Sequence, residues 1–218
     1  MTKLCIFDLD GTLINSLADL SCAMNYALSQ HGCNTHETEK YRFMVGSGIL
    51  VLIDRAVGER EDITPEIKKQ IHSDFNKYYT EHCLDFTRPY EGIPEMLDTL
   101  SANGILFAVN SNKPDDFAKL IVNSLFPDIK FAEIWGKRDS CERKPSPDGI
   151  NGILSELGIS KDEVVYIGDS DVDVLTAKNA GVSFCGVSWG FRPTEELISA
   201  GAEFIADTPA GILHFIGL

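Results

Sequence analysis

Short apolar runs with few polar interruptions recur along the chain and predict buried strands. Five of them stand out, and they are Leu4–Phe7, Ile105–Val109, Phe131–Trp135, Val164–Ile167 and Ser183–Val187. Runs without regular polar alternation are typical of strands that are covered on both faces, as in a parallel sheet. Helical patterns separate the last four runs, over Glu91–Asn103, Pro114–Leu125 and Pro147–Leu157. Repeated strand–helix units of this kind predict a doubly wound α/β fold.

The interval between the first two predicted strands carries helical signals and no strand pattern. Ser16 and Asp19 have the spacing of a capping box, and apolar positions then recur with a helical period. A second helical stripe begins at Pro65, a residue type favoured in the first turn of a helix. A crossover between parallel strands needs only about a dozen residues. We therefore expect an all-helical inserted domain over residues 16–85 and a catalytic core made of residues 1–15 and 86–218.

The composition limits the classes of partner. The chain has 218 residues, with 19 Lys and Arg against 33 Asp and Glu and a formal net charge of −14. Such an acidic surface repels phosphate backbones and anionic lipid, which argues against nucleic acid and membrane partners. No apolar run approaches the ~20 residues of a membrane-spanning helix, and the first residues turn acidic too early for a signal peptide. The six cysteines are scattered without a CxxC pair, so we expect reduced thiols and a cytoplasmic location.

Two carboxylates follow the first predicted strand. Asp8 and Asp10 are separated by a single residue, so both side chains can face the same side of the strand end. Gly11 permits a tight turn whose backbone amides can meet an anion, and Thr12 lies beside it. An ordinary Asp-Gly turn explains the same residues without any chemistry.

A second group of carboxylates follows the strand Val164–Ile167. Asp169 and Asp173 are four residues apart, which allows a helix that begins between them to bring both to one rim. Capping of that helix by Asp and Ser side chains accounts for part of the same pattern. A calcium loop is excluded, because Val174 and Ala180 stand where such a loop requires glycine and glutamate.

Two further segments carry groups that suit a phosphate. Strand Ile105–Val109 leads into Ser111 and Asn112, which offer a hydroxyl, an amide and the start of a helix. Lys144 lies in an extended, proline-stiffened segment before another helix. Each segment alone is typical of a surface turn. Together with the two carboxylate groups, however, they lie at or beyond the carboxyl ends of predicted strands, where open α/β sheets bind ligands.

In their order and spacing, the four segments resemble the motifs of the haloacid dehalogenase superfamily, in its phosphatase branch. They span almost the whole chain, and they are Asp8-x-Asp10-Gly11-Thr12, Ser111-Asn112-Lys113, Lys144-Pro145-x-Pro147 and Gly168-Asp169-Ser170-x-x-Asp173. The resemblance implies a core sheet with the strand order 3-2-1-4-5. It also implies that the helical insertion is a cap domain.

The resemblance assigns a catalytic role to four of the matched residues. Asp8 would be the nucleophile, and Asp10 would be the general acid and base. Ser111 and Lys144 would complete the catalytic set. Elementary chemistry agrees, because a carboxylate that attacks a phosphate dianion meets like-charge repulsion, which a hard cation and an ammonium can cancel.

The resemblance also implies two sets of ligands. The phosphate would be bound by Gly11, Thr12, Ser111, Asn112 and Lys144. The cofactor would be Mg²⁺, held at a metal site formed by Asp8, Asp10, Asp169 and Asp173, with Asp173 acting either directly or through water.

The identity of residue 10 and the inserted segment narrow the activity further. Within the family, dehalogenases have Tyr at this position, transport ATPases Thr and phosphonatases Ala. Asp10 therefore favours phosphatases and mutases, which must protonate an alkoxide leaving group.

The stretch Val45–Ala56 resembles the cap of phosphoglycolate phosphatases. Arg55 within it is a candidate to bind the substrate carboxylate, and its alternative is a solvated helix residue. The Trp189 side chain either lies beside the predicted active site or serves only in the packing of the protein interior.

From these features we expect a magnesium-dependent phosphatase that hydrolyses a small organic phosphate monoester through an aspartyl-phosphate. The leading candidate substrate is 2-phosphoglycolate. The alternatives are a phosphoglucomutase-like isomerase of the same fold, and a phosphatase for sugar phosphates, nucleotides or pyrophosphate. A non-enzymatic protein that binds a phosphorylated partner is a further alternative. We expect a monomer or a small homo-oligomer.

Overall fold

The computed structural model describes residues 1–60 and 62–218, and the chain divides into two compact units. The first unit contains Met1–Asn15 and Pro89–Leu218, and the second contains Ser16–Arg88. The chain leaves the first unit after strand β2 (Ile14–Asn15) and returns within β3 (Arg88–Pro89), and these strands form a two-stranded sheet.

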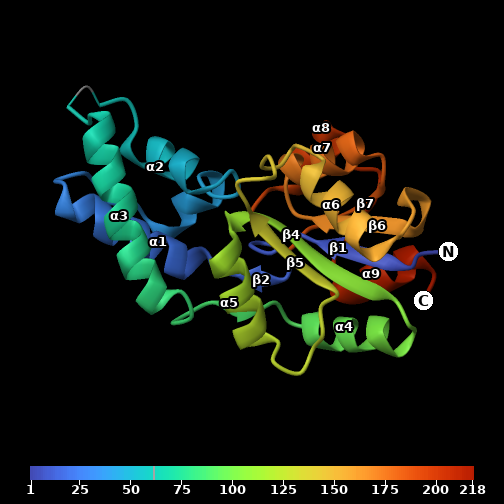
Figure 1. The fold of residues 1–218 in the computed structure, drawn as a ribbon. Coiled ribbons are helices and arrows are strands. Elements are labelled where there is room, and N and C mark those ends of the chain that lie inside the picture. Colours follow the sequence, from blue (N-terminus) through green and yellow to red (C-terminus); the bar gives the residue numbers. More distant parts are fainter. Residues whose placement is uncertain (61) are drawn as a thin grey trace. The chain divides into compact units, whose positions relative to one another are not determined.

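The first unit is built on a six-stranded parallel sheet (Figure 1). Its order is β5-β4-β1-β6-β7-β8. The strands are β1 (Leu4–Phe7), β4 (Leu106–Pro114), β5 (Glu133–Lys137), β6 (Val164–Gly168), β7 (Ser183–Val187) and β8 (Ile205–Ala206). The order of the five predicted strands is therefore 3-2-1-4-5, as expected. The two-residue strand β8 extends the sheet beyond β7 and was not predicted.

Helices cover both faces of this sheet (Figure 1). They are α4 (Ile93–Ala102), α5 (Asp115–Leu125), α6 (Asp148–Leu157), α7 (Asp171–Ala180), α8 (Thr194–Ala200) and α9 (Pro209–Ile216), with a 3-10 turn at Lys161–Glu163. The three helices predicted in this part of the chain are present, and each is shorter by one to three residues at the ends than the apolar period indicates, as expected where turn residues flank a helix.

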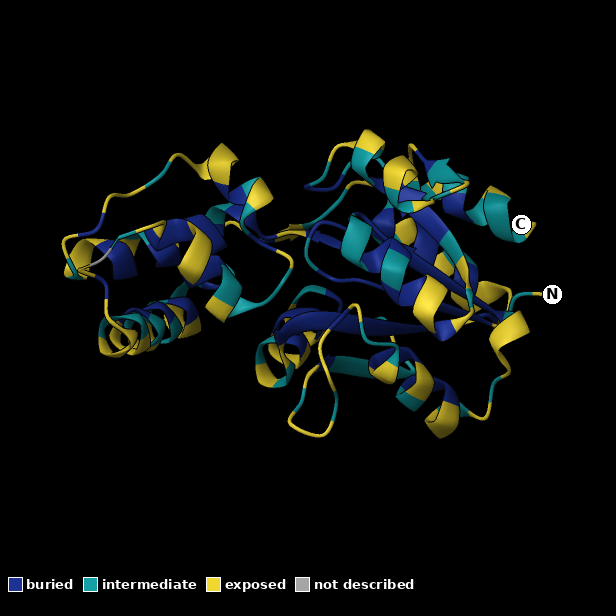
Figure 2. Cartoon of the chain, turned by 90° about the horizontal axis from the view of Figure 1, so that it is seen from above, coloured by how far each residue is buried: buried dark blue, intermediate teal, exposed yellow. Residues whose placement is uncertain are grey.

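The core explains why the central strands read as continuous apolar runs. All four residues of β1 are fully buried, and Figure 2 shows buried residues along the strands of the sheet. On one face, Leu4 and Ile6 pack with Tyr166 of β6 and with residues of α6 and α7. A strand in the middle of the sheet has covered neighbours on each side and on each face, so it needs no polar alternation.

Strand β4 differs from the prediction in an informative way. The apolar run ends at Val109, and Asn110–Lys113 looks like a turn, yet the strand continues to Pro114. The pairing of β4 with β5 shifts register between Asn110 and Pro114. Such bulges re-aim side chains next to functional sites, and this one contains the predicted site residues Ser111 and Asn112.

The second unit is all-helical in its described part. It contains α1 (Leu17–Gln30), a 3-10 helix (Thr38–Phe43), α2 (Ile49–Val57) and α3 (Pro65–His82). The capping box expected at Ser16 is absent, because the Ser16 side chain makes no capping hydrogen bond. Instead, the buried carboxylate of Asp19 accepts hydrogen bonds from the amides of Phe86 and Thr87 and from the Thr87 hydroxyl, at 2.6–3.1 Å. Asp19 thus fixes the segment that leads back to the first unit.

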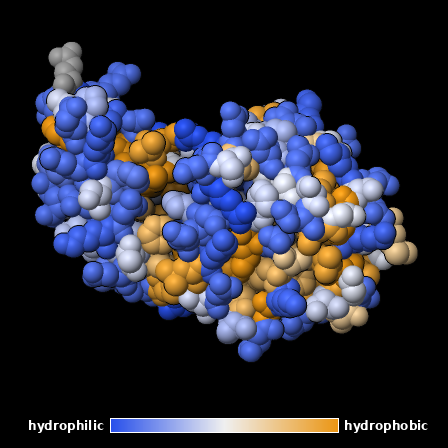
Figure 3. All heavy atoms as spheres, in the orientation of Figure 1, coloured by the Kyte–Doolittle hydropathy of each residue, from blue (hydrophilic) through white to orange (hydrophobic). Residues whose placement is uncertain are grey.

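The surface is largely hydrophilic on the face drawn in Figure 3, with smaller apolar patches among the charged residues. Exposed large apolar side chains of the second unit include Phe43, Leu50 and Phe86. Among residues 1–60 and 62–218, no helix has the length and apolar character needed to cross a membrane.

Candidate active site

The loops after β1, β4 and β6 meet at one edge of the sheet because these three strands are adjacent and parallel. Asp8 directly follows β1, and its amide donates a hydrogen bond to the carbonyl of Ile167 in β6 at 2.8 Å. Asp169 directly follows β6. The carboxyl ends of parallel strands are where α/β sheets bind ligands, and the sequence motifs converge at this edge.

Three carboxylates form a compact buried cluster. Oxygen atoms of Asp8, Asp169 and Asp173 all lie within 4.8 Å of one another, and the three residues are 7%, 2% and 0% exposed. Burial raises the pKa of Asp8 to about 7 and that of Asp169 to about 8, and the negative charge of Asp173 adds to both shifts. Buried like charges that crowd together favour a bound cation, and an all-oxygen donor set suits a hard divalent ion. These residues therefore fit a metal site.

Lys144 supplies the positive charge within this cluster. Its ammonium lies 2.8 Å from Oδ1 of Asp8 and 2.7 Å from Oδ1 of Asp173, and the residue is 6% exposed. Burial opposes this charge, but Asp173 and Asp8 outweigh that effect and hold the pKa of Lys144 well above its usual value. Lys144 is therefore a fixed ammonium beside the carboxylate of Asp8.

Asn112 holds the segment that carries Lys144. Its side-chain oxygen accepts from the Lys144 amide at 2.8 Å, and its side-chain nitrogen donates to the Lys144 carbonyl at 3.3 Å. This two-bond clamp joins β4 to the loop before α6. The sequence predicts Asn112 as a phosphate ligand, and the structure places its side-chain amide on the backbone of another predicted ligand.

Asp10 is paired with a lysine that the sequence analysis did not assign to the site. The Lys113 ammonium donates to both carboxylate oxygens of Asp10, each at 2.9 Å. The Lys113 amide also donates to Oγ of Ser111 at 3.2 Å. If Ser111–Lys113 is predicted as part of a strand rather than a turn, residues 111 and 113 are expected on the same side of that strand. The Asp10 carboxylate is therefore engaged with an ammonium of its own, outside the cluster of Asp8, Asp169 and Asp173, and its predicted place in the metal site stays a prediction.

The loop after Asp10 packs against Asp169. The Thr12 hydroxyl donates to Oδ1 of Asp169 at 3.2 Å, and the amide of Phe191 donates to Oδ2 at 2.7 Å. A Cβ atom added at Gly11, whose φ is +93°, would lie 2.4 Å from Oδ2 of Asp169, and one at Gly190 would lie 2.2 Å from its Cβ. The two glycines thus leave the space that the Asp169 side chain occupies.

Two further sequence predictions concern Trp189 and the start of α7. The Trp189 indole N–H donates to the carbonyl of Thr12 at 3.0 Å, so this side chain supports the loop behind Asp169. At the start of α7, Ser170 and Asp173 form a capping box. The helix-capping interpretation of this motif is therefore correct, and it operates alongside the position of Asp173 in the carboxylate cluster.

Arg55 lies in the second unit, at the end of α2. Its guanidinium donates to the carbonyls of Phe43 and Met44 at 3.3 and 2.9 Å and approaches the Ser47 hydroxyl at 3.5 Å. The residue is exposed. It therefore fixes the loop before α2, and its predicted contact with substrate stays a prediction.

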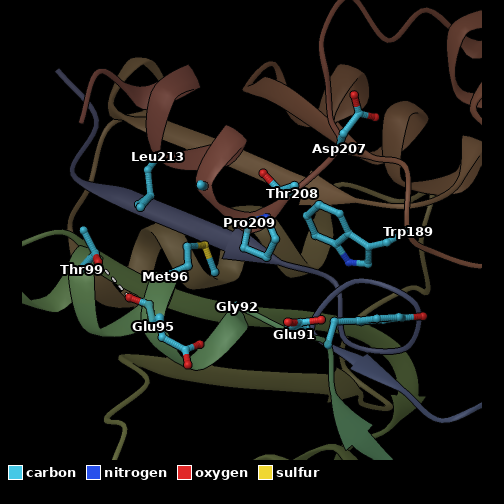
Figure 4. Close-up of a pocket in the computed structure, with 12 residues that line it drawn as sticks. Glu91, Gly92, Glu95, Met96, Thr99, Trp189, Asp207, Thr208, Pro209 and Leu213 are labelled. Atoms are coloured by element: carbon cyan, nitrogen blue, oxygen red, sulfur yellow. Dashed lines mark hydrogen bonds between the residues drawn. The ribbon is translucent and has the colours of Figure 1, made fainter.

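A separate cavity in the first unit contains none of the predicted catalytic or metal-binding residues. It has a volume of about 540 Å³ and lies between α4, the start of α9 and Trp189 (Figure 4). Its lining is mainly apolar and includes Met96 and Leu213, with carboxylates at Glu91, Glu95 and Asp207. Asp8, Asp169 and Asp173 lie instead at the carboxylate cluster.

The sequence matches the haloacid dehalogenase-like hydrolase family over residues 5–187. Phosphoglycolate phosphatase from Rhodospirillum rubrum is 32% identical, covering 100% of this chain and 92% of that protein. Phosphoglycolate phosphatase from Haemophilus influenzae is 31% identical, covering 98% of each. The solved structure of a predicted phosphoglycolate phosphatase from Haemophilus somnus has a TM-score of 0.91 and 31% identity, covering 99% of this chain and 98% of that one. The chain therefore belongs to the haloacid dehalogenase-like hydrolases.

Proposed function

We propose that this hydrolase is a magnesium-dependent phosphatase that cleaves a small organic phosphate monoester, with 2-phosphoglycolate as the leading substrate. One observation carries the proposal: Asp8 and Asp10 each contact a different buried lysine, Lys144 and Lys113. Two neighbouring carboxylates in different surroundings are suited to different roles. Asp8 would then be the nucleophile, and Asp10 would be the general acid and base.

The charge balance at the carboxylate cluster supports a phosphate substrate with a metal. Asp8, Asp169 and Asp173 bring three carboxylates against the single ammonium of Lys144. We propose that these residues hold Mg²⁺, which when bound would neutralise the cluster and polarise a phosphoryl oxygen. Lys144 and the Ser111 hydroxyl would bind the remaining phosphoryl oxygens. Without such positive charge, a dianion could not approach the Asp8 carboxylate.

The chemistry follows from the two aspartates. An oxygen of Asp8 attacks phosphorus, and the bond from phosphorus to the ester oxygen breaks, which gives an aspartyl-phosphate on Asp8. Asp10, which would enter this step protonated, gives its proton to the departing alkoxide. Asp10 then takes a proton from water, the water oxygen attacks phosphorus, and the Asp8 carboxylate leaves. The products are the alcohol and inorganic phosphate, and both aspartates return to their starting states.

The choice of 2-phosphoglycolate is supported by two relatives named phosphoglycolate phosphatase. Each of them aligns with this chain over nearly its whole length. This substrate also carries a carboxylate, which a guanidinium can bind in a charge-assisted pair. We propose Arg55 for that role. We also propose that the helical insertion, residues 16–85, is the domain that determines substrate specificity. We also propose a cytoplasmic protein that acts as a monomer or a small homo-oligomer.

A screen for released inorganic phosphate tests this function. The panel contains 2-phosphoglycolate, sugar phosphates, a nucleoside monophosphate and pyrophosphate, each with Mg²⁺ and with EDTA. We expect Mg²⁺-dependent release that is fastest from 2-phosphoglycolate and that EDTA abolishes. Faster release from another ester would replace the substrate, and isomerisation of a sugar phosphate without release would favour the mutase. Release that EDTA leaves unchanged would contradict the metal assignment.

A further inference from the structure

Tyr166 is a fully buried tyrosine in β6, a strand whose other residues are Val, Val, Ile and Gly. Its ring packs in the core with Leu4 and Ile6 and stacks with Phe184 at a centroid distance of 6.4 Å. A phenylalanine ring would fill the same space. The hydroxyl is therefore the feature that sets Tyr166 apart from an ordinary core residue.

The Tyr166 hydroxyl lies among the site's charged groups. It is 3.2 Å from the Lys144 ammonium, 3.2 Å from Oδ1 of Asp173 and 3.2 Å from the carbonyl oxygen of Asn110. A buried polar network is stable only when its members are satisfied. The hydroxyl can accept a proton at the first of these contacts and donate its own proton at one of the other two.

The donors and acceptors can be assigned from their chemistry. The ammonium of Lys144 has three protons and no lone pair. Two protons go to the carboxylates of Asp8 and Asp173, at 2.8 and 2.7 Å. The third goes to the Tyr166 oxygen, so the phenol proton must go to Asp173 or to the Asn110 carbonyl. Before substrate binds, every proton of the ammonium then has an acceptor, and the proton directed at Asp8 is the one that can pass to a phosphoryl oxygen once Asp8 attacks phosphorus.

The network also reaches the strand that carries Ser111. Asn110 precedes Ser111 in β4, at the start of the register shift. A phenol that accepts from Lys144 and donates to the Asn110 carbonyl links the two proposed phosphate ligands through one side chain. The position of the ammonium then depends on the same backbone that places the Ser111 hydroxyl.

We propose that Tyr166 is a positioning residue, whose hydroxyl holds the Lys144 ammonium between Asp8 and Asp173 for phosphoryl transfer. The inference rests on the proposed function, because it assumes that Lys144 faces the transferred phosphoryl group. Electrostatic stabilisation of a transition state depends on charges that are already in place. Without the hydroxyl, one ammonium proton has no acceptor within a buried site, and the lysine shifts from its position.

Tyr166→Phe tests this inference because it removes the hydroxyl and keeps the ring. Thr176→Val is the matched control: Thr176 is fully buried, and its hydroxyl donates to the Val172 carbonyl at 2.6 Å, a contact within α7 that involves no charged side chain. Each variant removes one buried hydroxyl, so both should have a lower thermal midpoint than the parent. The readouts are kcat and KM per folded molecule at saturating Mg²⁺, on the best ester of the screen.

For Tyr166→Phe we expect kcat to fall about 5- to 20-fold while KM changes by less than about threefold, because the loss is in the transition state. Thr176→Val should retain kcat within about twofold. A kcat for Tyr166→Phe within about twofold of the parent, or equal losses in the two variants, would overturn the inference.

Crystal structures of the parent and of Tyr166→Phe give a readout that does not depend on activity. We expect the Lys144 ammonium to leave at least one of its carboxylate partners in the variant. An ammonium that keeps both contacts would overturn the positioning role. If the parent releases phosphate from no ester, the proposed function fails, and the structural comparison still decides whether Tyr166 positions Lys144.

Discussion

Both carboxylate oxygens of Asp10 accept hydrogen bonds from the Lys113 ammonium, at 2.9 Å each, across a separation of 103 residues. The Lys113 side chain is 4% exposed and that of Asp10 is 15% exposed. A two-oxygen contact of this kind fixes the plane of the carboxylate as well as its position. In the proposed mechanism, Lys113 would therefore set the direction in which Asp10 delivers a proton.

Lys113→Met should lower kcat/KM for an alkyl phosphate about tenfold or more, because the leaving alkoxide needs a well-placed acid. p-Nitrophenyl phosphate, whose leaving group departs without a proton, should lose less than about threefold. Steady-state kinetics on both esters checks this. Lys119→Met is the matched control, since Lys119 pairs with Asp115 at 2.7 Å and is 47% exposed. Equal losses on the two esters would mean that Lys113 acts only through the fold.

The carboxylate cluster predicts how stability depends on pH. In the folded protein the pKa of Asp8 is about 7 and that of Asp169 about 8, against an ordinary value of 3.8. Between pH 3.8 and the folded-state pKa values of about 7 and 8, the folded protein binds protons that the unfolded chain does not. The free energy of unfolding therefore falls as pH rises through this range. In EDTA, the thermal midpoint should therefore decrease from pH 5 to pH 8.5. Mg²⁺ should raise it more at pH 8.5 than at pH 5, because the cation binds ionised carboxylates.

Asp169→Asn tests the source of that dependence. The variant should show a shallower decrease of the thermal midpoint with pH in EDTA, together with a smaller response to Mg²⁺. Asp98→Asn removes the same charge from an exposed position in α4 and should behave like the parent. A decrease of the same size in the parent and in Asp169→Asn would assign the dependence to the overall charge of −14 instead.

Arg55→Ala separates substrate binding from support of the loop before α2. Loss of a charge-assisted bond to the substrate carboxylate would lower kcat/KM for 2-phosphoglycolate by about 10- to 150-fold. p-Nitrophenyl phosphate has no carboxylate and should be little affected. Arg60→Ala, which removes an arginine that pairs with Asp62 in the same unit, is the control. Equal losses on both substrates would show that Arg55 acts by holding the Met44 carbonyl.

The parts of the fold that could be predicted from sequence are those that depend on burial. Strands β1 and β7 have the predicted bounds: β1 is buried throughout, and β7 is buried over its last three residues. Strand β8 has only two residues, too few for any pattern. The extension of β4 was missed because Asn110–Lys113 is polar like a turn, and only its pairing with β5 makes it a strand.

The site shows the same division between local and tertiary information. The convergence of Asp8, Asp169 and Lys144 follows from their places after parallel strands, so the motifs predict it. The contacts of Lys113 with Asp10 and of Tyr166 with Lys144 do not follow from the order of the strands. A lysine after Ser-Asn and a tyrosine in an apolar strand carry no local sign of their partners. The absent capping box at Ser16 has a similar origin, since Asp19 is used by Phe86 and Thr87.

The covalent intermediate on Asp8 is the central claim, and rapid acid quench during turnover of 2-phosphoglycolate, followed by peptide mass mapping, tests it most directly. We predict that the peptide containing Asp8 gains the mass of one phosphoryl group in the parent. Asp8→Asn should gain none and should lose turnover by orders of magnitude, because the amide cannot act as the nucleophile. Steady release of phosphate without this added mass, or turnover by Asp8→Asn near that of the parent, would contradict the account.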